Sequence, residues 1–233
     1  VSKTELTFKK KFIRSITGGQ VSSKKGTTTI NALSNLNLTI CSGQRIALIG
    51  HNGSGKSSFI RLISGIYTPT SGILKSSTNI YPLLQKSFLV SPSLTGIDAA
   101  KAHYLLIKNN YKNFDSFLED VKNFSDLGDF ISLPITTYSD GMAARLMFSL
   151  LTYFSHEFLA LDEGIGTGDA AFYNKANARL TEFIEKSGTL VFASHSKELL
   201  KKFCTRGLVF SEGTIVYDGQ LEDAIEYYDS KHS

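Results

Sequence analysis

The chain has 233 residues, of which 42% are hydrophobic and 20% charged, and its formal net charge is +4. This composition excludes a mostly disordered polypeptide. No apolar run reaches the roughly 18 residues that a membrane-spanning helix requires, and the N-terminus lacks the apolar segment of a signal peptide, so we expect a soluble cytosolic protein. Cys41 and Cys204 lie far apart without a C-x-x-C pair, which predicts two buried thiols and neither a disulfide framework nor a zinc cluster.

The positive charge is concentrated at the N-terminus. Residues 1–30 hold seven lysine or arginine side chains against one acidic side chain. Such an arm binds anionic lipid headgroups, binds nucleic acid, or is a solvated run of charge without a partner, and the sequence leaves all three open. The stretch 18–29, rich in glycine, serine, threonine and lysine, predicts an exposed loop.

Regular structure is expected to begin near residue 30. Apolar and polar residues alternate over 36–40, which predicts a strand, and a turn at Ser42-Gly43 separates it from a buried strand over 45–49. Apolar residues then keep helical spacing over 56–66, until Thr68-Pro69-Thr70-Ser71-Gly72 breaks the pattern. The predicted order is strand, glycine-rich loop, helix.

The rest of the chain alternates between the two kinds of pattern. Residues 94–154 predict a helical insertion, and the apolar runs 158–161 and 190–193 predict buried strands on either side of a helix over 170–186. This alternation predicts a parallel sheet whose ligands bind at the carboxyl ends of its strands. The last expected elements are a hairpin about Glu212-Gly213 and a helix over 221–228.

The loop over 50–57 carries the strongest chemical signal. It reads Gly50-His51-Asn52-Gly53-Ser54-Gly55-Lys56-Ser57 and fits the G-x-x-x-x-G-K-[ST] phosphate loop, between a predicted strand and a predicted helix. Backbone N–H groups and the helix N-terminus favour a phosphate there. Lys56 would bridge the β- and γ-phosphates and Ser57 would bind Mg²⁺. The alternative is an accidental glycine-rich turn, and His51 has no evident task.

Acidic side chains follow the buried strand 158–161. Asp162 is expected to hold Mg²⁺, and Glu163 to polarise the attacking water as general base. His195 ends the next strand, where it would bind the γ-phosphate or orient that water. A solvated Asp-Glu turn and a structural histidine are the alternatives.

Taken together these residues resemble a known family. The phosphate loop, Gln85, Tyr138-Ser139-Asp140-Gly141-Met142, Asp162-Glu163, Asp169 and His195 follow one another as in the nucleotide-binding subunit of an ATP-binding cassette (ABC) transporter, and the resemblance runs from about residue 30 to 228. It implies an α/β fold: a P-loop NTPase core with a mainly parallel sheet, an N-terminal antiparallel β subdomain and an inserted helical subdomain.

The resemblance also implies how the chain is divided. A single nucleotide-binding domain would cover residues 1–233, and no C-terminal carbohydrate-binding domain is expected. Its parts would be a basic arm and loop over 1–29, a catalytic lobe over 30–90 and 156–233, and a helical subdomain over 91–155.

Site residues follow from the same resemblance. Two chains would sandwich two ATP molecules, with Ser139 and Gly141 of one chain facing the phosphate loop of the other. Phe12, or alternatively Phe8, would stack on adenine, and Asp140, which departs from the usual LSGGQ signature, is expected to face solvent. The implied catalytic residues are Glu163, His195, Gln85 and Lys56; the implied Mg²⁺ ligands are Ser57, Gln85 and Asp162; the implied ATP-binding residues also include Gly50, Asn52, Gly53, Ser54, Gly55 and Ser58.

A narrower similarity is to the ATPase subunits that export O antigens, capsules and teichoic acids. It rests on residues 83–96, on 127–149 and on Gly168-Asp169-Ala170-Ala171-Phe172. This similarity implies a homodimer on the cytoplasmic face of the membrane, which docks near Gln85–Gly96 on two copies of a permease that carries a lipid-linked glycan. Nucleic acid is not expected as a partner. The alternatives are an ABC ATPase for lipid or drug, a nucleic-acid-linked switch ATPase, and a nucleotide or sugar kinase.

Overall fold

The computed structural model describes residues 20–24, 27–83, 91–162 and 170–232. The chain forms two compact units, each of which we describe by itself. Unit 1 comprises residues 1–83, 156–163 and 187–233, and unit 2 comprises residues 84–155 and 164–186. No helix in the described ranges combines the length and the apolarity needed to span a bilayer.

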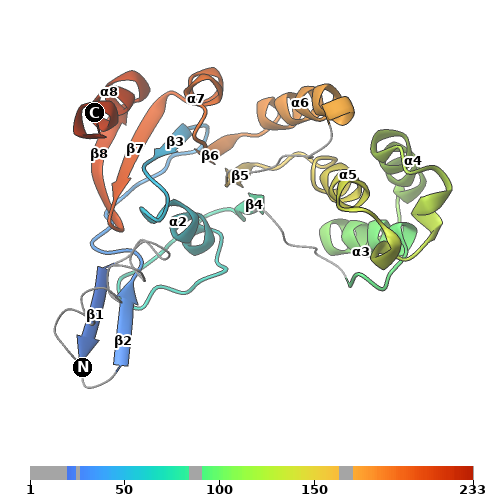
Figure 1. Cartoon of the computed structure of the whole chain (residues 1–233), viewed down its shortest axis with the longest axis horizontal. Coiled ribbons are helices and arrows are strands. Elements are labelled where there is room, and N and C mark those ends of the chain that lie inside the picture. Colours follow the sequence, from blue (N-terminus) through green and yellow to red (C-terminus); the bar gives the residue numbers. More distant parts are fainter. Residues whose placement is uncertain (1–19, 25–26, 84–90, 163–169, 233) are drawn as a thin grey trace. The chain divides into compact units, whose positions relative to one another are not determined.

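Unit 1 is built around a six-stranded sheet in the order β4-β5-β6-β3-β7-β8 (Figure 1). Its strands are β3 (Arg45–Ile49), β4 (Tyr81–Leu83), β5 (Phe158–Leu161), β6 (Thr189–Ala193), β7 (Arg206–Ser211) and β8 (Thr214–Gln220). All neighbours pair in parallel except β7 and β8, which form an antiparallel hairpin. The helices of this unit are α2 (Lys56–Ile63), α7 (Lys197–Phe203) and α8 (Leu221–His232).

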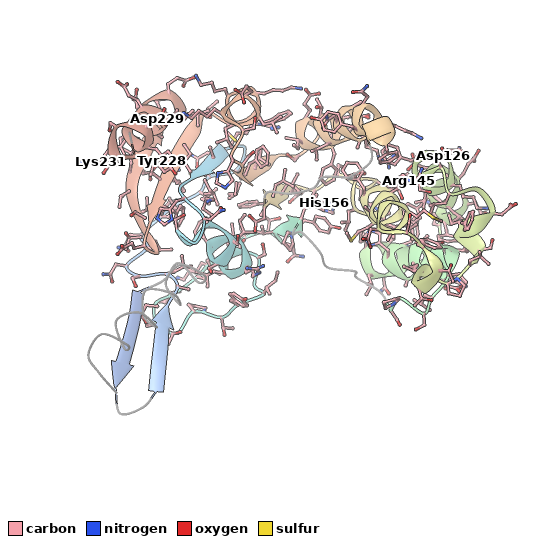
Figure 2. All side chains as sticks on the ribbon, in the orientation of Figure 1. Asp126, Arg145, His156, Tyr228, Asp229 and Lys231 are labelled. Atoms are coloured by element: carbon pink, nitrogen blue, oxygen red, sulfur yellow. The ribbon has the colours of Figure 1, made fainter. Side chains whose placement is uncertain are left out.

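The central strands form because their residues are apolar on both faces. Every residue of β5 and β6 is buried, as are residues 46–49 of β3, which is the pattern of a parallel sheet covered on both sides. The predicted strands 45–49, 158–161 and 190–193 and the parallel sheet are therefore confirmed. At the outer helices, Asp229 of α8, which is labelled in Figure 2, accepts two hydrogen bonds from Lys197 of α7, at 2.8 and 2.7 Å.

Several local predictions for unit 1 are wrong. Residues 18–29 are not simply a loop, because β1 (Gln20–Lys24) pairs with β2 (Thr27–Asn31) as a two-stranded antiparallel sheet. Backbone pairing needs no apolar period, and β-branched threonines favour strands. Conversely, 36–40 is not a strand: its alternation of half-buried and exposed residues is as predicted, but it pairs with no strand of the described chain.

Two further predictions differ in detail. Helix α2 ends at Ile63 and not at Ile66, because Gly65 takes the left-handed conformation (φ +73°) and the N–H of Ile66 bonds back to the carbonyl of Arg61. Cys41 is exposed in the coil before β3, whereas Cys204 is buried as predicted. Burial raises the pKa of the Cys204 thiol to about 12.

Unit 2 is helical, as the pattern over 94–154 predicts. Its helices are α3 (Gly96–Lys108), α4 (Phe114–Ser125), α5 (Asp140–Leu151) and α6 (Ala170–Glu185), with 3₁₀ turns η1 (Gly128–Ser132) and η2 (Ile135–Thr137). Helices α3, α4 and α5 share an aromatic core around Phe117, whose ring stacks on Phe154 with centroids 5.5 Å apart.

Helix α6 belongs to unit 2, whereas the expected catalytic lobe over 156–233 would include it. The reason is a set of contacts with α4. Arg179 makes two hydrogen bonds of 3.0 and 2.6 Å to Asp120, and its guanidinium lies 4.4 Å from the ring centroid of Phe124. Phe172 packs edge-on against the same ring. The helical period of α6 is predicted correctly from the sequence. Its place in unit 2 depends on contacts with α4, which no local sequence pattern reveals.

One buried histidine makes the stability of unit 2 depend on pH. His103 is 2% exposed among Phe117 and Phe154. Burial lowers its pKa from 6.5 to about 4, and a backbone hydrogen bond at Leu150 opposes this shift only in part. Between pH 6.5 and about 4 the unfolded chain binds a proton that the folded chain excludes, so stability falls as pH falls through this window.

We expect a loss of at most about 3 kcal/mol, since each pKa unit corresponds to about 1.4 kcal/mol. Denaturant unfolding of the wild type and of His103→Gln, measured from pH 7.5 to 4, tests this. The variant should show the shallower dependence on pH. Parallel curves for the two proteins would contradict the assignment.

Candidate nucleotide site

The phosphate loop connects β3 to α2, as its pattern predicts. Gly50 directly follows the buried end of β3, and its backbone has φ +152°. A Cβ at this position would lie 2.6 Å from the carbonyl oxygen of Phe210 and 2.6 Å from Ser54 Oγ. Only glycine therefore fits at the start of the loop, because any side chain would displace the backbone of β7.

Lys56 is the first residue of α2, and it is 8% exposed. Its ammonium donates hydrogen bonds to the carbonyl of Gly50 at 2.6 Å and to that of His51 at 3.1 Å. Two backbone carbonyls of the phosphate loop thus hold the Lys56 ammonium in place. A phosphate bound there would meet an ammonium that is already positioned.

The start of α2 fits an anion. Its N-cap residue, Gly55, provides no side-chain cap, and the first turn contains no acidic residue. The N–H groups at the start of this helix are therefore neither capped by a side chain nor balanced by a nearby carboxylate of the first turn. Ser54 is fully buried next to this turn, and its hydroxyl has no hydrogen-bond partner among the described residues. Together with Lys56, these donors suit the phosphate groups of a nucleotide.

The carboxyl ends of three neighbouring strands gather the other predicted residues on one edge of the sheet. Leu48 of β3 lies opposite Ala193 of β6, and Leu161 of β5 opposite Phe192. The ring of His195, two residues beyond β6, makes a 3.0 Å hydrogen bond through Nε2 to Oδ1 of Asn52. The structure therefore brings His195 to the phosphate loop.

Asp162 comes directly after β5, partly buried, and its N–H donates to the carbonyl of Leu83 at 3.1 Å. The described residues contain no group of three histidine, cysteine, aspartate or glutamate side chains that would hold a metal by itself. That is compatible with Mg²⁺, which proteins often bind through one or two side chains together with the phosphates of a substrate. The Ser57 hydroxyl and the Asp162 carboxylate are of the oxygen type that Mg²⁺ prefers.

The predicted signature segment lies in unit 2, at the start of α5. Ser139 is the N-cap of this helix, and its hydroxyl accepts from the N–H of Met142 at 3.3 Å. Ser139 and Asp140 are exposed and Gly141 is half-buried, so Asp140 faces solvent as predicted. The helix begins at Asp140, directly after this serine cap, which sets its first turn.

Several predicted residues lie outside the described ranges. These are the alternative adenine-stacking residues Phe8 and Phe12, and Gln85, Glu163 and Asp169. The described chain ends shortly before two of them. Leu83, the last residue of β4, lies two positions before Gln85, and Asp162 directly precedes Glu163. Ser58 is half-buried in the first turn of α2, and Gly53 is half-buried in the loop.

Two features of the site are not predicted from the sequence. Asn52 was expected to bind ATP, but its contact with His195 spans 143 positions and leaves no local signal. Strand β4 was also missed, since it has three residues and contains Pro82. Tyr81 of this strand stacks on His156, which is labelled in Figure 2, with ring centroids 3.6 Å apart. Burial raises the pKa of Tyr81 to about 12.

The geometry defines a P-loop nucleotide-binding protein of the α/β class, with a glycine-rich loop, a lysine at a helix N-terminus, and polar side chains at adjoining strand ends. A model of the ABC transporter family matches residues 33–166. The chain belongs to the ABC transporter family.

Several proteins similar to this chain are named as ATP-binding proteins of O-antigen or teichoic acid export. It is 37% identical to the O-antigen export system ATP-binding protein RfbE of Yersinia enterocolitica, over 88% of this chain and 89% of the relative. It is 34% identical to the O-antigen export protein RfbB of Myxococcus xanthus and 34% identical to the teichoic acids export protein TagH of Enterococcus faecalis. Those matches cover 85% and 86% of this chain but only 45% and 44% of the relatives.

Solved structures agree on the fold. An ATP-binding subunit of an ABC transporter superposes with a TM-score of 0.67 over 91% of this chain and 92% of that chain, at 18% identity. A dimeric ATP-binding cassette with bound ADP and phosphate gives 0.64 over 86% and 95%, at 19% identity. At these identities the likeness concerns the fold alone, and it confirms the predicted ABC ATPase fold.

Proposed function

We propose that this chain is the ATP-hydrolysing subunit of an ABC transporter that exports a lipid-linked polysaccharide, such as an O antigen, a capsule or a teichoic acid, across the cytoplasmic membrane. The observation that carries the substrate class is the 37% identity to RfbE over 89% of that protein. The phosphate loop, with Lys56 held above it, carries the nucleotide chemistry.

ATP binds through its phosphates to the loop over 50–57. The first-turn N–H groups of α2 and the Lys56 ammonium neutralise phosphate charge, and Ser54 and Ser58 lie in the same segment. Ser57, Asp162 and Gln85 would hold Mg²⁺ together with the phosphate oxygens, and the ion would neutralise phosphate charge. Phe12 stacks on adenine.

Hydrolysis needs a water that is oriented and deprotonated in line with the γ-phosphate. Glu163 acts as the general base, directly after the Mg²⁺ ligand Asp162. His195 is tied to the loop by its hydrogen bond to Asn52, which supports a role at the γ-phosphate. Catalysis comes mainly from positioning and charge neutralisation, since phosphoryl transfer leaves little covalent work for side chains.

Two chains complete the site. The exposed N-terminus of α5 presents Ser139 and Gly141 with a favourable helix dipole, which supports their binding the γ-phosphate of the partner chain's ATP. ATP would close this homodimer and hydrolysis would reopen it. Two copies of a membrane permease would dock near Gln85–Gly96 and carry the glycan, with the ATPase peripheral on the cytoplasmic face.

The substrate is tested by deleting the gene in its source organism and locating the glycan. Wild-type and Glu163→Gln copies are returned in parallel. We expect glycan stranded inside the deleted cells and rescue of surface glycan by the wild type alone. An unchanged surface glycan would overturn the substrate, and an altered lipid or drug response would then indicate another cargo.

A further inference from the structure

We propose that the turn of the β7–β8 hairpin, Glu212-Gly213, positions the phosphate loop for nucleotide binding. The inference rests on the proposed ATP-binding function and adds to it an element remote in sequence. In Figure 1 the orange hairpin turns beside the blue segment that leaves β2. The turn lies between that segment and the phosphate loop, and it contacts both through backbone atoms.

Two hydrogen bonds fix the turn. The N–H of Gly213 donates to the carbonyl of Ser54, inside the phosphate loop, at 2.8 Å. The carbonyl of Gly213 accepts from the N–H of Ser34 at 2.9 Å. Gly213 therefore bridges the loop and the segment after β2 by main-chain groups alone, which sets a distance that no rotamer change can alter.

The space around this bridge admits no side chain on the turn. Gly213 has φ +81°, and a Cβ there would lie 2.5 Å from the carbonyl oxygen of Ala32. From the other side, a Cβ on Gly55 would lie 3.3 Å from Gly213 Cα and 3.1 Å from Leu33 Cδ2. Gly213, Gly55 and the Ala32–Leu33 segment are thus packed backbone against backbone.

The strand leading into the turn supports the loop as well. Strand β7 runs parallel to β3 with Val209 opposite Ile49, so Phe210 arrives beside Gly50. The ring of Phe210, 1% exposed, packs against Phe59 of α2 with centroids 5.3 Å apart. A register shift between Val209 and Phe210 marks a β-bulge, a device that redirects strands next to functional sites.

A Cβ at position 213 must therefore push the turn away from Ala32. Because the N–H of residue 213 is bonded to the carbonyl of Ser54, the displaced turn also moves Ser54. Because Ser54 and Gly55 immediately precede Lys56, this movement disturbs the N–H groups and the ammonium that receive phosphate. The expected effect is on nucleotide affinity, beyond any general loss of stability.

The test compares Gly213→Ala, Gly213→Asn and Gly43→Ala by titration with ADP and Mg²⁺ in a calorimeter. Gly43 is the matched control: its φ is +80°, and a Cβ there would meet nothing within 4 Å. Asparagine tolerates a positive φ but still carries a Cβ. We expect Gly213→Ala and Gly213→Asn both to bind ADP at least 10-fold more weakly than wild type, and Gly43→Ala to bind within twofold of it.

The outcomes separate the possible explanations. Normal ADP binding by Gly213→Asn would show that only φ strain matters and would overturn the inference, as would equal loss in Gly43→Ala. Should the Gly213 variants fail to fold, Leu33→Ala decides, with at least threefold weaker ADP binding expected and unchanged binding overturning the inference. Wild-type protein that binds no ADP would instead contradict the proposed function.

Discussion

Lys56→Ala is expected to weaken Mg-ATP binding by about 100-fold or more and to abolish ATP hydrolysis. The ammonium is buried and held by the carbonyls of Gly50 and His51, in the position where it would meet phosphate oxygens. Truncating one partner of a buried, hydrogen-bonded charge pair costs about 2–5 kcal/mol, which corresponds to this loss of affinity. Calorimetric titration and phosphate release measure the two effects.

Lys186→Ala is the matched control for this variant. Lys186 is exposed and pairs with Glu182 one helical turn away, so its loss should change neither binding nor turnover. If Lys56→Ala bound Mg-ATP as tightly as this control, the loop over 50–57 would not be the phosphate site.

Glu163→Gln is expected to lower turnover by about 100-fold to 10,000-fold, because it removes the general base while keeping shape and hydrogen-bonding groups. Binding of ATP should persist, so that a nucleotide-bound dimer accumulates. Phosphate release measures the loss of turnover. Light scattering in the presence of ATP measures the mass of the protein and so detects the dimer.

Glu157→Gln makes the same chemical change at the other end of β5. Glu157 is exposed and accepts a hydrogen bond from Thr78 at 3.0 Å, which a glutamine oxygen also accepts. This control should hydrolyse ATP as the wild type does. Wild-type turnover by Glu163→Gln would remove Glu163 from the mechanism.

The sequence predicts the centre of this site because its signals are local. Residues 45–63 contain, one after another, an apolar run, three glycines, a lysine and an apolar helical period. Strand β3, the phosphate loop and α2 form there as expected. The strands before Asp162 and His195 are predicted for the same reason. Placement of their ends on one edge of the sheet follows from the parallel topology.

What the sequence does not predict depends on distant partners. The 36–40 segment has a strand-like pattern without a paired strand, whereas β1 and β2 pair without an apolar pattern. The period of α6 is evident, but its place in unit 2 is set by Arg179 and Asp120, 59 positions apart. The bridge from Gly213 to Ser54 is likewise a backbone contact with no signal in the sequence.

Inverted membrane vesicles allow a direct measurement of whether ATP hydrolysis by this chain moves a polysaccharide. They are prepared from the deletion strain carrying either wild-type or Glu163→Gln protein and loaded with the strain's lipid-linked glycan on the outer, cytoplasmic face. The measured quantity is the fraction of glycan that becomes protected from an added glycan-degrading enzyme. We expect protection that needs both ATP and the wild-type chain. Protection without ATP, or equal protection with Glu163→Gln, would show that ATP hydrolysis by this chain does not move the glycan.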